Sequence, residues 1–194
     1  MKKLALTICL TLAVLLGSTG TSWGADYEKG LVAYQSGDFA TALRELTPFA
    51  EQGNADAQHN LGWMYGLGKG VPQDYKTAMK WFILAAEQGI AKSQHNLGWM
   101  YRKGLGVPQD YKTAVKWYTL AAEQGNTYAQ NNLGLMYHKG QGVLQNYVYA
   151  HMWGNIAASN GNENGGKLRD SVAETMIPRL CDRLCRKMTG IGHN

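Results

Sequence analysis

The stretch QHNLGWMY at residues 58–65 decides the fold, because the chain repeats it without change at residues 94–101. Residues 55–90 and 91–126 align without a gap, and 27 of the 36 aligned positions are identical. Residues 127–162 form a third copy that keeps 18 of 36 positions relative to the second. Self-similarity at a fixed period of this length is typical of a stacked repeat array.

Each copy is expected to form two helices. In the first copy, Ala57, Leu61 and Met64 recur at the i, i+4, i+7 spacing of one helix face. Asp74 is a typical N-cap for a second helix, and Gly89 is placed to end that helix in the left-handed conformation. One two-helix unit cannot bury both of its apolar faces, so neighbouring units must stack. The sequence therefore predicts an all-α fold, an α-solenoid of antiparallel helical hairpins.

A glycine recurs inside the first helix of every copy, as Gly62, Gly98 and Gly134. Glycine in a helix interior costs about 1 kcal/mol relative to alanine. We therefore expect the partner helix to approach closely at these positions, since such an approach would compensate for that cost.

Residues 1–24 have the pattern of a secretory signal peptide. Lys2 and Lys3 precede an apolar run of 13 residues, and small and polar residues follow that run as far as Gly24. The run is too short to cross a bilayer, which needs roughly 20 residues. We therefore expect cleavage near Gly24 and Ala25, no transmembrane segment in the mature chain, and a periplasmic or secreted protein.

Two further segments flank the three copies. Residues 25–54 form a shorter first unit that lacks about four loop residues. Within residues 163–194, Leu168, Val172 and Met176 have helical spacing, which predicts a helix that caps the last hairpin. A basic tail follows that helix.

The charge balance argues against a nucleic-acid partner. Removal of residues 1–24 takes away two of the 19 lysines and arginines and leaves all 14 acidic residues, for a net charge of +3. Nucleic-acid-binding domains carry a larger and more clustered basic surplus.

The segment GLGKG at residues 66–70 looks at first like a loop that could hold a phosphate. Its first glycine aligns with Arg102 and His138, whereas Gly68 and Gly70 recur in every copy. A phosphate loop needs G-x-x-x-x-G-K-[ST], or G-x-G-x-x-G between a strand and a helix, and neither occurs here. We therefore expect a turn between two helices, and no cofactor.

The repeated pattern A-x-A-Q-x-N-L-G-x-M-Y…G-x-G-V-P-Q-D-Y-x-x-A-x-x-W…A-A-E-Q-G resembles the Sel-one-like repeat, a relative of the tetratricopeptide repeat. The match is close over residues 55–126 and good over residues 127–162, whereas residues 25–54 look more like a plain tetratricopeptide unit. The resemblance implies a right-handed superhelix that binds other proteins, often as a periplasmic or secreted adaptor or regulator. It implies a non-catalytic protein with a protein or peptide partner, and we expect a monomer.

The same resemblance implies that the first helices line a concave surface. His59 and Trp63 share a helix face, as do His95 and Trp99, and this face is expected to point away from the hairpin partner. A partner-binding groove would then have as its floor His59, Trp63, His95, Trp99, Arg102, Asn131, Leu135 and His138. The alternative is that Trp63 and Trp99 pack against the next repeat, and the sequence does not decide between the two.

No metal site is expected. His59 and His95 lie one repeat apart, about 10 Å for packed helices, and no carboxylate recurs beside them. Cys181 and Cys185 lack the second ligand pair that a structural zinc site uses. Their helical spacing is also poor for a disulfide within one chain, which leaves pairing between chains open.

One enzymatic alternative comes from the resemblance, a β-lactamase-like hydrolase, because some cysteine-rich relatives have that assignment. Such chemistry would use S-x-x-K together with K-T-G. Neither motif occurs after residue 24, and the repeats lack the cysteine pair of those relatives. We therefore expect a protein that is not an enzyme and has no catalytic residues.

Overall fold

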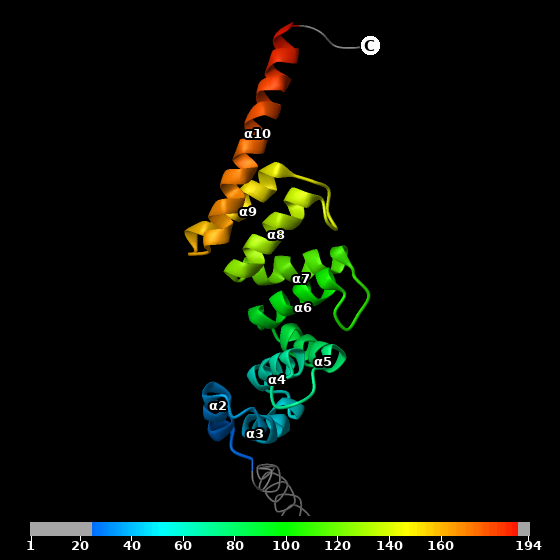
Figure 1. Cartoon of the computed structure of the whole chain (residues 1–194), viewed down its shortest axis with the longest axis vertical. Coiled ribbons are helices and arrows are strands. Elements are labelled where there is room, and N and C mark those ends of the chain that lie inside the picture. Colours follow the sequence, from blue (N-terminus) through cyan, green and yellow to red (C-terminus); the bar gives the residue numbers. More distant parts are fainter. Residues whose placement is uncertain (1–24, 190–194) are drawn as a thin grey trace, which may run out of the picture.

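The computed structural model of this chain describes residues 25–189, with side chains described for residues 25–177. All regular structure in the described range is helical. The helices are α2 (Tyr27–Ser36), α3 (Phe39–Glu51), α4 (Ala55–Leu67), α5 (Tyr75–Glu87), α6 (Ala91–Lys103), α7 (Tyr111–Glu123), α8 (Thr127–Lys139), α9 (Tyr147–Ser159) and α10 (Glu163–Thr189). Figure 1 shows them stacked along one long axis, with α2 and α3 at one end and α10 projecting from the other. The predicted α-solenoid is confirmed, whereas the expected signal peptide lies outside the described residues.

Consecutive helices form hairpins, and the hairpins stack in chain order. The first helices α4, α6 and α8 pack on α5, α7 and α9 of their own units, and each second helix also contacts the first helix of the next unit. Two residues join α2 to α3, whereas the seven residues 68–74 join α4 to α5. The first unit is therefore shorter in its loop, as the sequence indicates.

The helix ends follow the capping residues that the sequence supplies. The Asp74 carboxylate accepts hydrogen bonds from the backbone N–H groups of Lys76 (2.9 Å) and Thr77 (3.2 Å), which makes Asp74 the N-cap of α5. Gly89 lies just beyond the end of α5 with a φ of +92°, in the left-handed region that glycine adopts without strain. Both predicted helix ends are confirmed.

The G-x-G segments are turns between paired helices. Gly68 ends α4 with a φ of +66°, and its N–H donates to the carbonyl of Met64. A β-carbon at Gly70 would lie 2.8 Å from the β-carbon of Phe39, because the turn packs against the start of α3. The predicted turn is confirmed, and both recurring glycines have a structural reason.

The glycines inside the first helices mark close helix contacts. A β-carbon at Gly62 would lie 2.7 Å from the ring of Phe82 in α5, and one at Gly98 would lie 2.6 Å from the ring of Tyr118 in α7. Both rings belong to the partner helix of the same hairpin. The expected close approach of the partner helix is confirmed at Gly62 and Gly98. At Gly134 the nearest atom is Leu168 Cδ2 of α10 at 2.8 Å, and Ala150 O of the partner helix α9 lies at 3.2 Å.

A ladder of amide side chains links each hairpin to the next. The buried side chains of Gln58, Gln94 and Gln130 donate to the carbonyls of Ala50, Ala86 and Ala122, at 2.9, 3.1 and 3.1 Å. The same three glutamines accept from Gln88, Gln124 and Asn160, at 2.8, 2.7 and 3.1 Å. Each of these carbonyls also accepts a hydrogen bond from the backbone N–H of the glycine after its helix, Gly53, Gly89 or Gly125, so each glutamine adds a further hydrogen bond that joins two units.

The last helix covers the end of the array. Leu168 and Val172 are buried, and Met176 packs against the same apolar cluster. The helix continues through Pro178 to Thr189, but the side chains of Cys181, Cys185 and the basic tail lie outside those described. None of the helices in the described part of the chain is long and apolar enough to cross a membrane.

Candidate binding surface on the first helices

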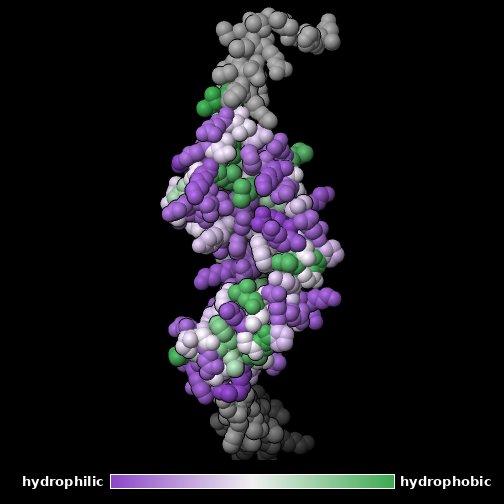
Figure 2. Space-filling view, viewed as in Figure 1, coloured by the Kyte–Doolittle hydropathy of each residue, from purple (hydrophilic) through white to green (hydrophobic). Residues whose placement is uncertain are grey.

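The first helices share one solvent-facing stripe of side chains, which we call the first-helix face. Its members recur at i, i+4, i+7 and i+11 in each helix, and all are exposed or half-buried. They are Asp56, Asn60, Trp63 and Leu67 in α4, Lys92, Asn96, Trp99 and Lys103 in α6, and Tyr128, Asn132, Leu135 and Lys139 in α8. Figure 2 shows that hydrophobic groups on the side in view are small and separated by hydrophilic surface.

The two predicted histidines lie between helices rather than on this face. The ring of His59 lies 5.8 Å from that of Phe82 in α5, and its Nδ1 shares a 2.8 Å hydrogen bond with Ser93 Oγ in α6. His95 makes equivalent contacts with Tyr118 in α7 and with α8. The expectation that these side chains point away from the hairpin partner was therefore wrong, because each one bridges its own second helix and the next unit.

Burial keeps both imidazoles neutral. Burial, helped by the nearby Lys92 ammonium, lowers the pKa of His59 to about 4. Burial likewise lowers the pKa of His95 below its usual range. No group of three or more histidine, cysteine or acidic residues that could hold a metal ion lies within the described residues. The two histidines thus act here as neutral hydrogen-bonding spacers between units.

His59 also borders an open depression at the start of α4 and α6. This depression has a volume of about 500 Å³, and its walls include Tyr27, Asp56 and Lys92. It is wide and carries charges of both signs, so it offers no enclosed space for one side chain.

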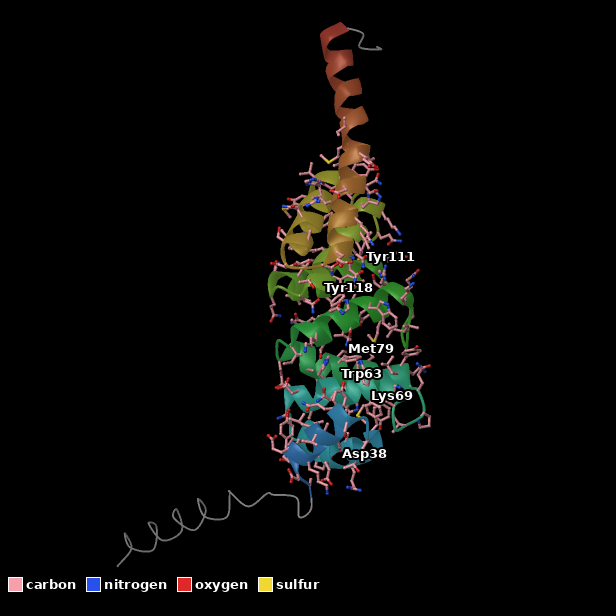
Figure 3. All side chains as sticks on the ribbon, turned by 60° about the vertical axis from the view of Figure 1, so that its left-hand side comes forward. Asp38, Trp63, Lys69, Met79, Tyr111 and Tyr118 are labelled. Atoms are coloured by element: carbon pink, nitrogen blue, oxygen red, sulfur yellow. The ribbon has the colours of Figure 1, made fainter. Side chains whose placement is uncertain are left out.

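The two predicted tryptophans differ in their surroundings. Trp63 packs edge-on against Tyr34, with ring centres 5.6 Å apart, and lies 5.9 Å from Phe39. Both partners belong to the preceding unit, so Trp63 does not pack only toward the next repeat. Trp99 is exposed. Figure 3 shows Trp63 between Asp38 and Tyr118 along the array.

An apolar pocket of about 240 Å³ lies between α4 and α6. Trp63 and Trp99 line it from the two first helices, and Phe82 lines it from α5. The other residues around it are Gly66, Leu67, Tyr75, His95, Asn96 and Met100. Gly66 borders this space, and a β-carbon built there would meet nothing nearer than Ala78 Cβ at 3.6 Å, so the position has room for a side chain.

The aligned positions one repeat further on carry more polar side chains. Arg102 stands where the first copy has Gly66, and Tyr118 stands where it has Phe82. Burial raises the pKa of Tyr118 to about 12, and the neighbouring Arg102 guanidinium opposes that shift. Among the described side chains, Arg102 Nε, the Tyr118 hydroxyl and Asn131 Oδ1 are buried with no hydrogen-bond partner of good geometry. This space therefore holds polar groups of the protein itself.

The predicted site residues lie in different local surroundings along the first helices. Trp63, His95 and Trp99 meet in the apolar pocket. Arg102 lies by Tyr118 in the second space, and His138 packs edge-on against Tyr147 at 5.6 Å. The sequence analysis did not predict that Phe82 and Gly66 line this pocket. The occurrence of Gly66 in only one of the three copies is the feature that could have indicated it.

The first-helix face carries a positive charge around Trp99. In α6, Lys92 and Lys103 lie on the same stripe as Trp99, one on each side of it along the helix. The only acidic residue in the sequences of α4, α6 and α8 is Asp56. An acidic ligand segment would therefore be attracted to this face.

Stacked antiparallel hairpins with a period of 36 residues define a protein of the α-solenoid class. The family model described as the Sel1 repeat matches residues 55–90, 91–126 and 127–162. The chain belongs to the Sel1 repeat family. Members of this family are generally protein-interaction scaffolds and are typically non-catalytic.

Solved structures support the same assignment. A Sel1 repeat protein from Oxalobacter formigenes is 36% identical with a TM-score of 0.68, over 72% of this chain and 58% of that one. The protein c5321, a protective antigen of uropathogenic Escherichia coli strains with an SLR fold, is 42% identical with a TM-score of 0.69, over 72% of this chain and 31% of that one. This chain thus spans less than two thirds of either relative.

A more distant structure shows the fold alone. Helicobacter pylori cysteine rich protein B is 20% identical, with a TM-score of 0.54 over 66% of this chain and 96% of that one. The comparison with curated proteins gives no match to this chain.

Proposed function

We propose that this protein is a non-catalytic adaptor or regulator that binds a protein or peptide segment on its first-helix face. The pocket between Trp63 and Trp99 receives one large apolar side chain of that segment. The observation that carries this proposal is an apolar, aromatic-walled space bordered by Gly66, which has no side chain to occupy it. Aromatic residues around such a pocket supply much of the energy of protein interfaces.

The size of the pocket supports a side chain as its occupant. Its volume of about 240 Å³ is below the range of roughly 300–1,000 Å³ that is typical of small-molecule sites. A single leucine, methionine or phenylalanine side chain suits a space of this size and lining. The rest of the ligand would lie across α6, where Lys92 and Lys103 favour acidic residues on either side of the apolar one.

Selection from a random peptide library tests this proposal. The immobilised chain without residues 1–24 should enrich peptides that carry one large apolar residue near aspartate or glutamate. Gly66→Arg introduces the residue that the second copy has at this position, so the variant should fold and close the pocket. We expect the enriched peptides to bind Gly66→Arg at least tenfold more weakly.

A matched control lies on the opposite side of the hairpin. Lys116→Ala changes an exposed residue of α7, outside the first-helix face, and should leave peptide binding unchanged. The proposal fails if the selected peptides bind Gly66→Arg as tightly as the original chain, or if Lys116→Ala weakens them equally.

We also propose that the protein works after export, in the periplasm or outside the cell. The support is the signal-peptide pattern of residues 1–24. In cell fractions, the mature protein should leave the cytoplasm and begin near Ala25, as mass spectrometry of its N-terminal peptide can show. A cytoplasmic protein that retains Lys2 and Lys3 would contradict export without affecting the proposed binding site.

A further inference from the structure

Arg102 of α6 has no acidic partner among the described side chains. The other two arginines in this part of the chain make ion pairs, Arg44 with Glu45 at 2.9 Å and Arg169 with Asp170 at 2.8 Å. Arg102 is half-buried, and its Nε is buried without a hydrogen-bond partner. A charge partly removed from water costs free energy unless an opposite charge or a hydrogen-bond acceptor compensates for it.

The surroundings of Arg102 supply no negative charge. Asp56 is the only acidic residue in the sequences of α4, α6 and α8, and it lies at the start of its helix, whereas Arg102 lies at the end of α6. The side chain that Arg102 adjoins is Tyr118 of α7, which is fully buried. Burial raises the pKa of Tyr118 to about 12, so its hydroxyl stays neutral and does not balance the guanidinium charge.

Arg102 lies one helix spacing beyond the apolar pocket. It follows Trp99 by three residues, which makes the two side chains neighbours on α6. Gly66 borders the pocket from α4, and Arg102 is the aligned residue one repeat further on. Packed helices lie about 10 Å apart, so the pocket and the guanidinium are separated by about that distance. Figure 3 shows Tyr118 further along the array than Trp63.

We propose that Arg102 binds a carboxylate side chain of the same peptide segment whose apolar side chain enters the pocket, with Tyr118 as the residue that positions the guanidinium. This inference rests on the proposed function and adds a second, spaced contact to it. An extended peptide rises about 3.3 Å per residue. The aspartate or glutamate therefore lies about three positions from the large apolar residue of the ligand.

Arg102 suits this role better than the two lysines of the first-helix face. Lys92 and Lys103 are exposed, and ion pairs between exposed side chains contribute little, because water and salt screen them. The guanidinium group is planar and can donate two parallel hydrogen bonds to one carboxylate. Its contact with Tyr118 also restricts its motion before the ligand binds. The lysines thus attract acidic segments in general, whereas Arg102 selects the position of one acidic residue.

Parallel selections from the random peptide library test the inference. The targets are the original chain, Arg102→Gln and Lys103→Gln, each without residues 1–24. Glutamine keeps much of the length of the arginine and removes its charge, and the other copies have glycine and histidine at this position, so the variant should fold. Lys103→Gln is the matched control, because it removes the same charge from the next, exposed residue.

The enriched peptides are then aligned on their large apolar residue. We expect aspartate or glutamate about three positions from it for the original chain and for Lys103→Gln, and no acidic preference at that position for Arg102→Gln. A preference that persists on Arg102→Gln, or that is absent from the original chain, overturns the inference. Retention of the apolar residue on all three targets leaves the proposed function intact, whereas its absence from the original selection contradicts both.

A double-mutant cycle measures the contact itself. Replacement of the acidic residue of one enriched peptide by its amide should weaken binding to the original chain about tenfold and leave binding to Arg102→Gln nearly unchanged. Equal losses on both proteins would mean that Arg102 does not contact the carboxylate, and would overturn the inference.

Tyr118→Phe tests the positioning role of the hydroxyl. Phenylalanine is the residue of the first copy at this position, Phe82, so the helical circular dichroism should not change. We expect the acid-to-amide effect in the peptide to fall about threefold, while the preference for the apolar residue stays. An undiminished effect would show that Tyr118 does not position Arg102.

Discussion

The space between α4 and α6 and the space between α6 and α8 occupy matching places in the array but have different linings. In the first, Gly66 and Phe82 leave an apolar pocket of about 240 Å³. In the second, the aligned residues are Arg102 and Tyr118, whose polar atoms are buried in the interface. The positions that recur build the scaffold, so the positions that differ decide which of the two spaces can accept a ligand.

The largest expected difference in stability is between alanine substitutions at Gly106 and at Gly66. Gly106 has a φ of +74°, and a β-carbon there would lie 2.7 Å from the carbonyl oxygen of Tyr75. Gly106→Ala should therefore lose about 3 kcal/mol or more of stability, from backbone strain and overpacking. Gly66→Ala has space for its methyl group and should be neutral or stabilising by up to about 1 kcal/mol, because alanine is the better helix former.

Urea unfolding followed by circular dichroism measures both changes. Equal losses of unfolding free energy for Gly106→Ala and Gly66→Ala would mean that Gly66, which occurs in one copy only, is as tightly packed as Gly106. That result would contradict free space beside Gly66.

Trp63 and Trp99 should differ in how much each contributes to stability. Trp63→Ala removes contacts with Tyr34 and Phe39 and should destabilise the protein by about 2 to 3 kcal/mol. Trp99→Ala removes a side chain that is 37% exposed and should cost less stability than Trp63→Ala, while still weakening peptides that occupy the pocket. Thermal unfolding and peptide titration of the two variants check this. A Trp99→Ala loss as large as that of Trp63→Ala would show that Trp99 is a packing residue instead.

His59 should make the first units sensitive to acid. The pKa of His59 is about 4 in the folded state, below its usual value of about 6.5, so the unfolded chain binds its proton first as the pH falls. This residue's contribution to stability is therefore constant above about pH 6.5 and is lost between about pH 6.5 and pH 4. The loss should be on the order of 3 kcal/mol.

His59→Asn introduces the residue type that the third copy has at the aligned position, Asn131. Asp56 and Lys92 are the charged groups that act on His59, and both stay in the variant. Carboxylates elsewhere titrate in the original chain and in the variant alike, so the difference between the two pH profiles isolates the histidine. Parallel profiles from pH 7 to pH 4 would contradict a buried, neutral His59.

The repeats allowed most of the fold to be predicted from the sequence. Asp74, Gly68 and Gly70 act locally, through caps and left-handed turns, so their roles follow from residue type and spacing. The direction of His59 and the contact of Trp63 with the preceding unit could not be predicted, because they depend on how successive hairpins rotate against each other.

The pocket escaped prediction for a different reason. Gly66 does not recur in the other copies, so the repeat pattern assigns it no structural role. Recurrence identifies residues that every unit needs for stacking. A binding pocket in one unit depends instead on a departure from the pattern, and only the packing around Ala78 and Phe82 shows the resulting space.

The number of peptides bound per chain tests the central claim most directly. Isothermal titration of one peptide enriched by the original chain should give one site per chain for that chain and none for Gly66→Arg. Arg102→Gly opens the aligned space between α6 and α8 and should give a second site. An unchanged number of sites in all three proteins would contradict the claim that the residue at this position decides where a partner binds.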